Sequence, residues 1–204
     1  VLPMLPKELS NGICSLNPNE DRLTLSVRMD FDKNGEVLSH KISEAIINSD
    51  HRLNYPQVSD FLEGKKKAEE LGLEGLEDTL KNMEELMHIL NEKRNKRGNI
   101  DFDIVETKVV LDEKGKVVDI RPDERRVANQ IIEEFMIAAN ETVAKDYFMK
   151  DIPFVYRVHE KPKREKMFYL SEFLKRFELY INPDNVTSAD IANVLNELKG
   201  KKES

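Results

Sequence analysis

The sequence contains no tryptophan and only one cysteine, Cys14, so an internal disulfide is excluded. No apolar run approaches the roughly 18 residues of a membrane-spanning helix, and the N-terminus has no basic region followed by an apolar one. We therefore expect a cytoplasmic protein with no membrane partner. Because no candidate base lies near Cys14 in the sequence, we interpret it as a small buried apolar residue rather than a catalytic thiol.

Positive charge is not in excess, since 32 Lys and Arg stand against 39 Asp and Glu, for a formal net charge of −7. An acidic total argues mildly against a stand-alone nucleic-acid binder, because affinity for phosphates comes largely from Lys and Arg. Basic residues nevertheless cluster at positions 65–67, 93–97 and 161–166, so local positive surface is compatible with the negative total. Glycine-rich phosphate loops, Cys/His metal spacings and Gly-x-Ser-x-Gly elbows are all absent.

The chain has the length and the hydrophobic content, 39%, of a single globular domain spanning residues 1–204. We expect an α+β fold, in which antiparallel hairpins pack against a long central helix and flanking helices. Alternating apolar residues and turn signals predict one hairpin over residues 23–47 and another over 107–120. Helical periodicity predicts a short helix near residues 58–62 and longer ones over 76–97, 123–149, 162–177 and 187–198, the last with Thr187 as N-cap. Residues 1–10 are predicted to be extended, 64–75 a loop and 152–158 a short strand.

The predicted central helix carries polar residues beside its apolar face. One broad arc gathers Ile131, Ile132, Phe135, Met136, Ala139 and Val143. Glu134 falls on the opposite side, so we interpret it as solvated surface. Asn129, Glu133 and Asn140 form a third line at the edge of the apolar arc, where a polar side chain needs a hydrogen-bonding partner. Two interpretations remain: a polar network within the fold, or side chains turned toward a ligand.

Other candidate site residues lie in predicted loops and strand ends. The Asp30/Asp32 and Asp101/Asp103 pairs carry the oxygen ligands that Mg²⁺ prefers, although aspartate is also common beside hairpin turns. Phe102 either packs in the core or stacks on a nucleobase. Arg157 and His159 lie near a predicted strand end, where they suit contacts with phosphate or ribose, or structural hydrogen bonds.

Four blocks of sequence together resemble one family. They begin with Pro-Met-Leu-Pro at residues 3–6, continue as Leu-Ser-Asn-Gly-Ile-Cys-Ser-Leu-Asn-Pro at 9–18 and Asp-Arg at 21–22, and include residues 94–102, 119–140 and 152–159. In their order and spacing the chain resembles the RNB catalytic domain of the ribonuclease II/ribonuclease R exoribonucleases, most closely the ribonuclease R branch. This resemblance implies processive 3′→5′ hydrolysis of single-stranded RNA to nucleoside 5′-monophosphates, with Mg²⁺ as cofactor and no DNA expected as substrate.

The resemblance also implies roles for individual residues. It matches Phe102 to an aromatic that stacks on the terminal bases and Glu133 to a glutamate that contacts the 3′-terminal nucleotide. Arg157 and His159 fall in a family block and are expected to bind substrate.

The family's aspartate-rich metal motif and its catalytic arginine block are missing from this sequence. We therefore expect an internal fragment of an RNB domain that holds no metal ligands and is inactive alone. The alternative is a non-catalytic RNA-binding or scaffold module.

Overall fold

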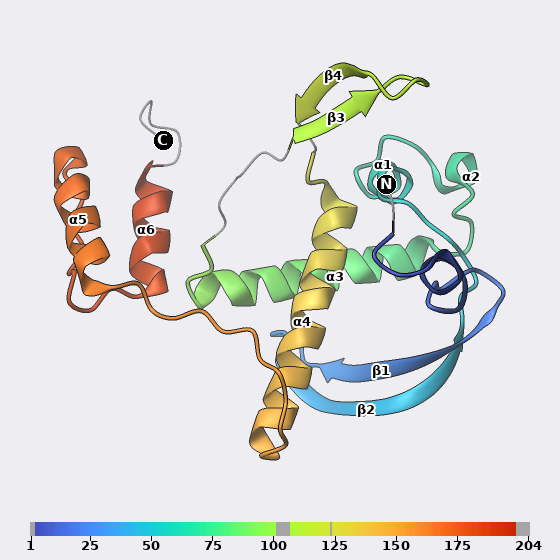
Figure 1. The fold of residues 1–204 in the computed structure, drawn as a ribbon, viewed down its shortest axis with the longest axis horizontal. Coiled ribbons are helices and arrows are strands. Elements are labelled where there is room, and N and C mark those ends of the chain that lie inside the picture. The colour runs from blue at the N-terminus through green and yellow to red at the C-terminus, as the bar shows by residue number, and fades with distance from the viewer. Residues whose placement is uncertain (1–2, 101–106, 123, 199–204) are drawn as a thin grey trace. The chain divides into compact units, whose positions relative to one another are not determined.

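The computed structural model describes residues 3–100, 107–122 and 124–198 (Figure 1). The chain divides into two compact units, which comprise Val1–Ile89 with Arg125–Phe154 and Leu90–Glu124 with Val155–Ser204. Within the described ranges, each unit combines helices with one two-stranded antiparallel hairpin. The predicted α+β class is therefore confirmed.

The hairpin of the first unit pairs β1 (Asp21–Phe31) with β2 (Val37–Asn48). Asp32 organises its turn, because its Oδ1 accepts from the backbone N–H groups of Asn34 and Glu36, each at 2.8 Å. Gly35 has a φ of 77°, whereas Asn34 does not adopt positive φ. The register shifts between Asp30 and Phe31, so the connection resembles a type I turn followed by a glycine bulge rather than a two-residue Asn-Gly turn.

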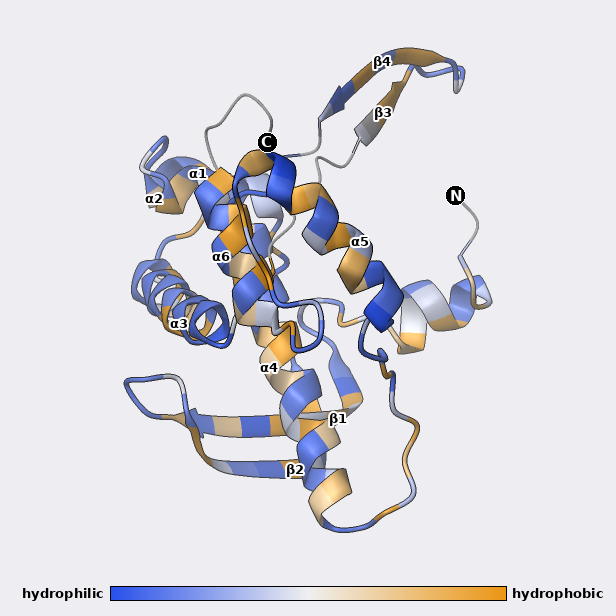
Figure 2. Cartoon of the chain, turned by 90° about the vertical axis from the view of Figure 1, so that its left-hand side faces the viewer, coloured by the Kyte–Doolittle hydropathy of each residue, from blue (hydrophilic) through white to orange (hydrophobic). Residues whose placement is uncertain are grey.

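The hairpin of the second unit, β3 (Thr107–Leu111) and β4 (Val117–Pro122), uses the same turn chemistry. Asp112 Oδ1 accepts from the N–H groups of Lys114 and Lys116 at 2.9 and 2.8 Å, and Gly115 has a φ of 78°. Both predicted hairpins are thus confirmed. Their apolar residues are less covered than the alternation predicted: Leu23 and Leu25 on β1 are 85% and 74% exposed, and Figure 2 shows apolar residues along exposed β3 and β4.

The core of the first unit lies where four helices and a loop meet. It is formed by side chains from α1 (Tyr55–Leu62), α2 (Ala68–Leu71), α3 (Glu77–Lys96), α4 (Val127–Met149) and the segment after α2. Its buried members are Val58, Ala68, Leu73, Leu80 and Ala128. The loop predicted over residues 64–75 is wrong in part, because α2 forms there and buries Ala68. At the other end of α4, Asp146 Oδ1 lies 2.9 Å from His40 Nε2 on β2, which joins this hairpin to the helix.

Two further expectations for regular structure are corrected. The opening segment, predicted to be extended, contains a π-helical turn, η1, at Leu9–Ile13. Residues 152–158 form no strand, and Val155 and Val158 are 94% and 79% exposed. Alternating apolar residues favour an extended backbone, but a strand also needs a neighbouring strand, and no strand of the described part of the chain pairs with residues 152–158.

The second unit has its own small core, to which α5 (Arg164–Leu174) and α6 (Ser188–Leu198) contribute. The 3₁₀ turn η2 (Lys175–Phe177) comes directly after α5 and before α6. Leu174, Leu179 and Val194 are the buried members of this core. Thr187 Oγ1 accepts from Asp190 N–H at 3.2 Å, and Asp190 Oδ2 accepts from Thr187 N–H at 2.8 Å. The predicted N-cap is therefore confirmed, with the reciprocal bonds of a capping box.

Candidate functional site

The first turn of α4 is fixed to α1 by hydrogen bonds. Arg126, the N-cap residue, has an extended backbone with φ −90° and ψ 176°. Its N–H donates to Asn129 Oδ1 at 3.3 Å, and Ala128 N–H donates to Ser59 Oγ at 3.2 Å. Because the Ser59 side chain is fully buried, this second bond satisfies a polar group inside the core and sets where the helix begins.

Two carboxylates of the α1 region bind the Arg126 guanidinium. Its Nε and Nη2 donate to the two oxygens of Glu63 at 3.1 and 2.8 Å, and Nη2 also donates to Asp60 Oδ1 at 2.6 Å. Hydrogen bonds from Arg126, the larger effect, and from Lys65 lower the pKa of Glu63 to about 2. Hydrogen bonding to Arg126 also lowers the pKa of Asp60. The same bonds raise the pKa of Arg126. A two-pronged contact of this kind fixes direction as well as distance.

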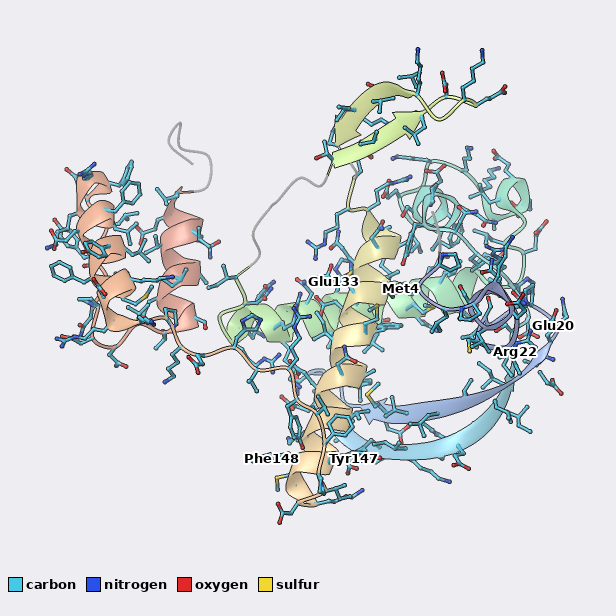
Figure 3. All side chains as sticks on the ribbon, viewed as in Figure 1. Met4, Glu20, Arg22, Glu133, Tyr147 and Phe148 are labelled. Atoms are coloured by element: carbon cyan, nitrogen blue, oxygen red, sulfur yellow. The ribbon has the colours of Figure 1, made fainter. Side chains whose placement is uncertain are left out.

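Glu133 lies on the first half of α4 (Figure 3), where it forms an ion pair with Arg125. Arg125 Nε lies 2.9 Å from Glu133 Oε2, and the two side chains are 40% and 39% exposed. Arg125 precedes the helix, so its side chain extends along the first two turns, toward the C-terminal end of the helix, to reach a residue eight positions later. The predicted location of Glu133 at the edge of the buried face agrees with its half-exposed side chain.

Glu134 corrects the prediction of a solvated side chain, because it is only 2% exposed. The buried face of α4 is centred on Ala128, Ile131, Glu134 and Thr142. Ile132 and Met136, which the sequence placed within the buried arc, are 37% and 59% exposed. Apolar residues occur on more than one side of this helix, so hydropathy alone predicted the wrong buried face. The contacts of α4 with α1 and the core determine which face is buried.

The polar line of Asn129, Glu133 and Asn140 separates into three environments. Asn129 is a capping residue, which supports the structural interpretation at this position. Glu133 faces Arg125, and Asn140 is exposed. The line is therefore not one continuous network among the described contacts.

The remaining predicted site residues lie elsewhere. Phe102 lies outside the described residues. Arg157 and His159 are exposed, two positions apart on the irregular segment that precedes α5, and they belong to the second unit, whereas Glu133 belongs to the first. The structure thus brings Glu133 together with Arg125, a residue that sequence reasoning had not paired with it. A spacing of eight residues between an arginine outside a helix and a glutamate inside it matches neither of the usual helical ion-pair spacings.

The Asp30/Asp32 pair, considered as a source of Mg²⁺ ligands, does not form a metal site with other described residues. Asp30 Oδ2 accepts from Ser39 Oγ at 2.6 Å, and this bond, reinforced by Arg28, lowers the pKa of Asp30. Asp32 holds the hairpin turn. Asp101 and Asp103 lie outside the described residues. Within residues 3–100, 107–122 and 124–198, no group of three His, Cys, Asp or Glu side chains is placed to hold a metal ion.

Cys14 is also corrected, since its side chain is exposed rather than buried. It follows the π-helical turn, and its N–H donates to Leu9 O at 3.0 Å. The segment that carries it lies on the surface of the first unit, where a small apolar residue gains no burial.

Comparison with known proteins agrees with this α+β architecture and identifies its family. The RNB domain family matches residues 1–204. Ribonuclease R of Thermotoga maritima is 48% identical over 86% of the chain, and ribonuclease R 1 of Lactococcus lactis is 43% identical over 89%. A solved structure described as Mycoplasma genitalium RNase R in complex with double-stranded RNA superposes with a TM-score of 0.87 over 98% of the chain, at 35% identity. The chain belongs to the RNB domain family.

The relatives are much longer than this chain. The chain spans 24% of the Thermotoga protein, 22% of the Lactococcus protein and 35% of the Mycoplasma structure. Among the described helices, none combines the length and the apolar character needed to cross a membrane.

Proposed function

We propose that this chain forms part of a cytoplasmic, processive 3′→5′ exoribonuclease, which hydrolyses single-stranded RNA to nucleoside 5′-monophosphates. The observation that carries the proposal is the match to the RNB domain over residues 1–204, together with the relatives named ribonuclease R at 48% and 43% identity. The RNA complex of the Mycoplasma relative supports RNA as the partner.

The chain is further proposed to be an internal part of an RNB domain. Hydrolysis would require Mg²⁺, whose ligands we assign to parts of the protein outside residues 1–204. The described residues do not offer a site that fits the ion. Bound Mg²⁺ supplies a charge that activates water and stabilises the leaving oxygen. This chain's own residues would instead hold the RNA.

Glu133 is the proposed contact for the 3′-terminal nucleotide. Its side chain is 39% exposed and its Oε2 lies 2.9 Å from Arg125 Nε, so a ligand can reach this carboxylate from solvent and donate hydrogen bonds to it. Phe102 is proposed to stack on a terminal base, a contact worth about 1–3 kcal/mol per base. Arg157 and His159 are proposed to bind substrate from their exposed segment.

The activity is tested on the full-length protein that contains this chain. With Mg²⁺ and a single-stranded RNA labelled at its 5′ end, we expect mononucleotides to be released. RNA molecules that the enzyme has not yet bound should keep their full length until late in the reaction. An internal cut, or degradation from the 5′ end, contradicts the proposal. If the full-length protein binds RNA without hydrolysing it, the alternative of a non-catalytic RNA-binding module is correct.

A second assay tests the fragment interpretation. The purified 204-residue chain, incubated with the same RNA and Mg²⁺, is expected to release no mononucleotides, and robust release would overturn this interpretation.

Phe102→Ala in the full-length protein tests the stacking role. It is expected to weaken binding of short RNA ends at unchanged thermal stability. A loss of stability without a loss of binding would instead identify Phe102 as a core residue.

A further inference from the structure

We propose that Arg125 is a positioning residue for Glu133, which it orients and charge-compensates so that a carboxylate can face the end of an RNA strand. This inference rests on the proposed function, in which Glu133 contacts the 3′-terminal nucleotide. Its basis is the 2.9 Å contact between Arg125 Nε and Glu133 Oε2, made by a residue just outside the helix to a residue two turns into it.

The backbone at the start of α4 makes this contact possible. Arg126 has an extended conformation, in which successive side chains point to opposite sides of the chain. Its guanidinium is directed to Glu63 and Asp60 in the α1 region, whereas that of Arg125 is directed along α4. The two consecutive arginines therefore have different roles: Arg126 fixes the beginning of the helix, and Arg125 contacts Glu133.

The binding of RNA explains why a carboxylate at this position needs a cation. A glutamate close to the phosphates of a nucleic acid is repelled by them, and the repulsion increases as water is displaced from the contact. A guanidinium at hydrogen-bonding distance offsets the negative charge while leaving a carboxylate to accept hydrogen bonds from the nucleotide. It also restricts the Glu133 rotamer before RNA arrives, which reduces the ordering cost of binding.

A double-mutant cycle on the full-length protein tests the inference. Equilibrium binding of a short single-stranded RNA with a fluorescent 5′ label is measured by anisotropy, with EDTA present to prevent hydrolysis, for wild type, Arg125→Met, Glu133→Gln and the double variant. Because exposed ion pairs contribute only a modest free energy, Arg125→Met is expected to weaken RNA binding about two- to fivefold. In the Glu133→Gln background the same change is expected to have no further effect. Arg125→Lys, which keeps the charge but not the planar fork, should fall between wild type and Arg125→Met.

The outcomes separate the two levels of the proposal. If the full-length protein does not bind the RNA, the proposed function fails. If it binds but Glu133→Gln has wild-type affinity, the role of Glu133 fails and the role of Arg125 fails with it. If Glu133→Gln weakens binding but Arg125→Met does not, only the Arg125 inference is overturned. It is also overturned if Arg125→Met weakens binding equally in both backgrounds and reduces the salt dependence by about one phosphate contact, since Arg125 would then bind phosphate directly.

Arg126→Met is the matched control for loss of an adjacent arginine. Its partners are Glu63 and Asp60, so it is expected to lower the thermal unfolding temperature more than Arg125→Met does. If Arg125→Met produced the larger loss of stability, its main role would be structural and the inference would fail.

Discussion

Replacing Glu63 with glutamine removes one carboxylate from the Arg126 contact while keeping the size and shape of the side chain. Hydrogen bonds from Arg126, the larger effect, and from Lys65 lower the Glu63 pKa from an ordinary value of 4.5 to about 2. At about 1.4 kcal/mol per pH unit, the full lowering corresponds to about 3 kcal/mol. The side chain is 29% exposed, so solvent screening reduces the expected loss of stability to about 1–2 kcal/mol at pH 7.

The pH dependence has a definite direction. Because the Glu63 pKa is lower in the folded state, its stabilising effect is fully present above the unfolded value of about 4.5 and is lost as the pH falls toward 2. The difference in thermal unfolding temperature between wild type and Glu63→Gln should therefore shrink by more than half between pH 7 and pH 3. A difference that stayed constant over this range would refute the linkage to Glu63 ionisation.

Hydrogen–deuterium exchange measures where the effect acts. At pH 7, backbone amides of α1 and of the first turns of α4 in Glu63→Gln are expected to exchange about 5- to 30-fold faster than in wild type. Amides of α5 and α6 should be unaffected, since they belong to the other unit. Wild-type exchange rates throughout α1 and α4 would refute the assignment of this contact to the anchoring of the helix.

Glu92→Gln is the matched control, because it removes an equivalent carboxylate from an exposed pair. Glu92 Oε1 lies 2.7 Å from Lys96 Nζ, and the side chains are 67% and 73% exposed. A pair this exposed contributes little to stability, so the variant should change the unfolding temperature little. If Glu92→Gln destabilised the protein as much as Glu63→Gln, the two-pronged geometry of Arg126 would not explain the larger effect.

Two further substitutions test the cores of the two units. Leu73→Ala, at a fully buried position of the first unit, is expected to lower the free energy of unfolding by about 2–5 kcal/mol, measured by urea denaturation. Gly98→Ala should destabilise the second unit, because Gly98 has a φ of 86° and an added Cβ would lie 2.6 Å from Ala189 N. Gly115→Ala is the control, because Gly115 also has a positive φ but an added Cβ there would meet no atom within 4 Å. The difference between the two variants therefore measures the effect of the clash with Ala189. Equal thermal destabilisation by both variants would contradict a role for this contact.

Local sequence signals predicted most of the regular structure. The helix predicted over residues 76–97 is observed at Glu77–Lys96, and the two hairpins occur where alternating residues flank an Asp-x-x-Gly turn. Thr187 caps α6 as expected. These features depend on side chains only a few residues from the backbone groups they satisfy, so the sequence alone contains the relevant chemistry.

The candidate site was predictable only in part. The sequence separated Glu133 from the buried face of α4, and the structure leaves that side chain half exposed. Its partner Arg125 was missed because the pair spans the beginning of the helix at an unusual spacing. The roles of Phe102, Glu133, Arg157 and His159 in binding RNA remain predictions that the experiments above address.

The sequence by itself determined both hairpins, most of the helices and the family to which this chain belongs, because these properties follow from local hydrogen bonding and from residue order. Tertiary structure decided which side of α4 is buried. Glu134 and Glu133 are adjacent carboxylates of the same type, yet one is 2% exposed and the other contacts Arg125 at the surface. Packing of α4 against α1, fixed by Arg126 and Ser59 across more than sixty residues of sequence, sets this rotation, and no local pattern encodes it.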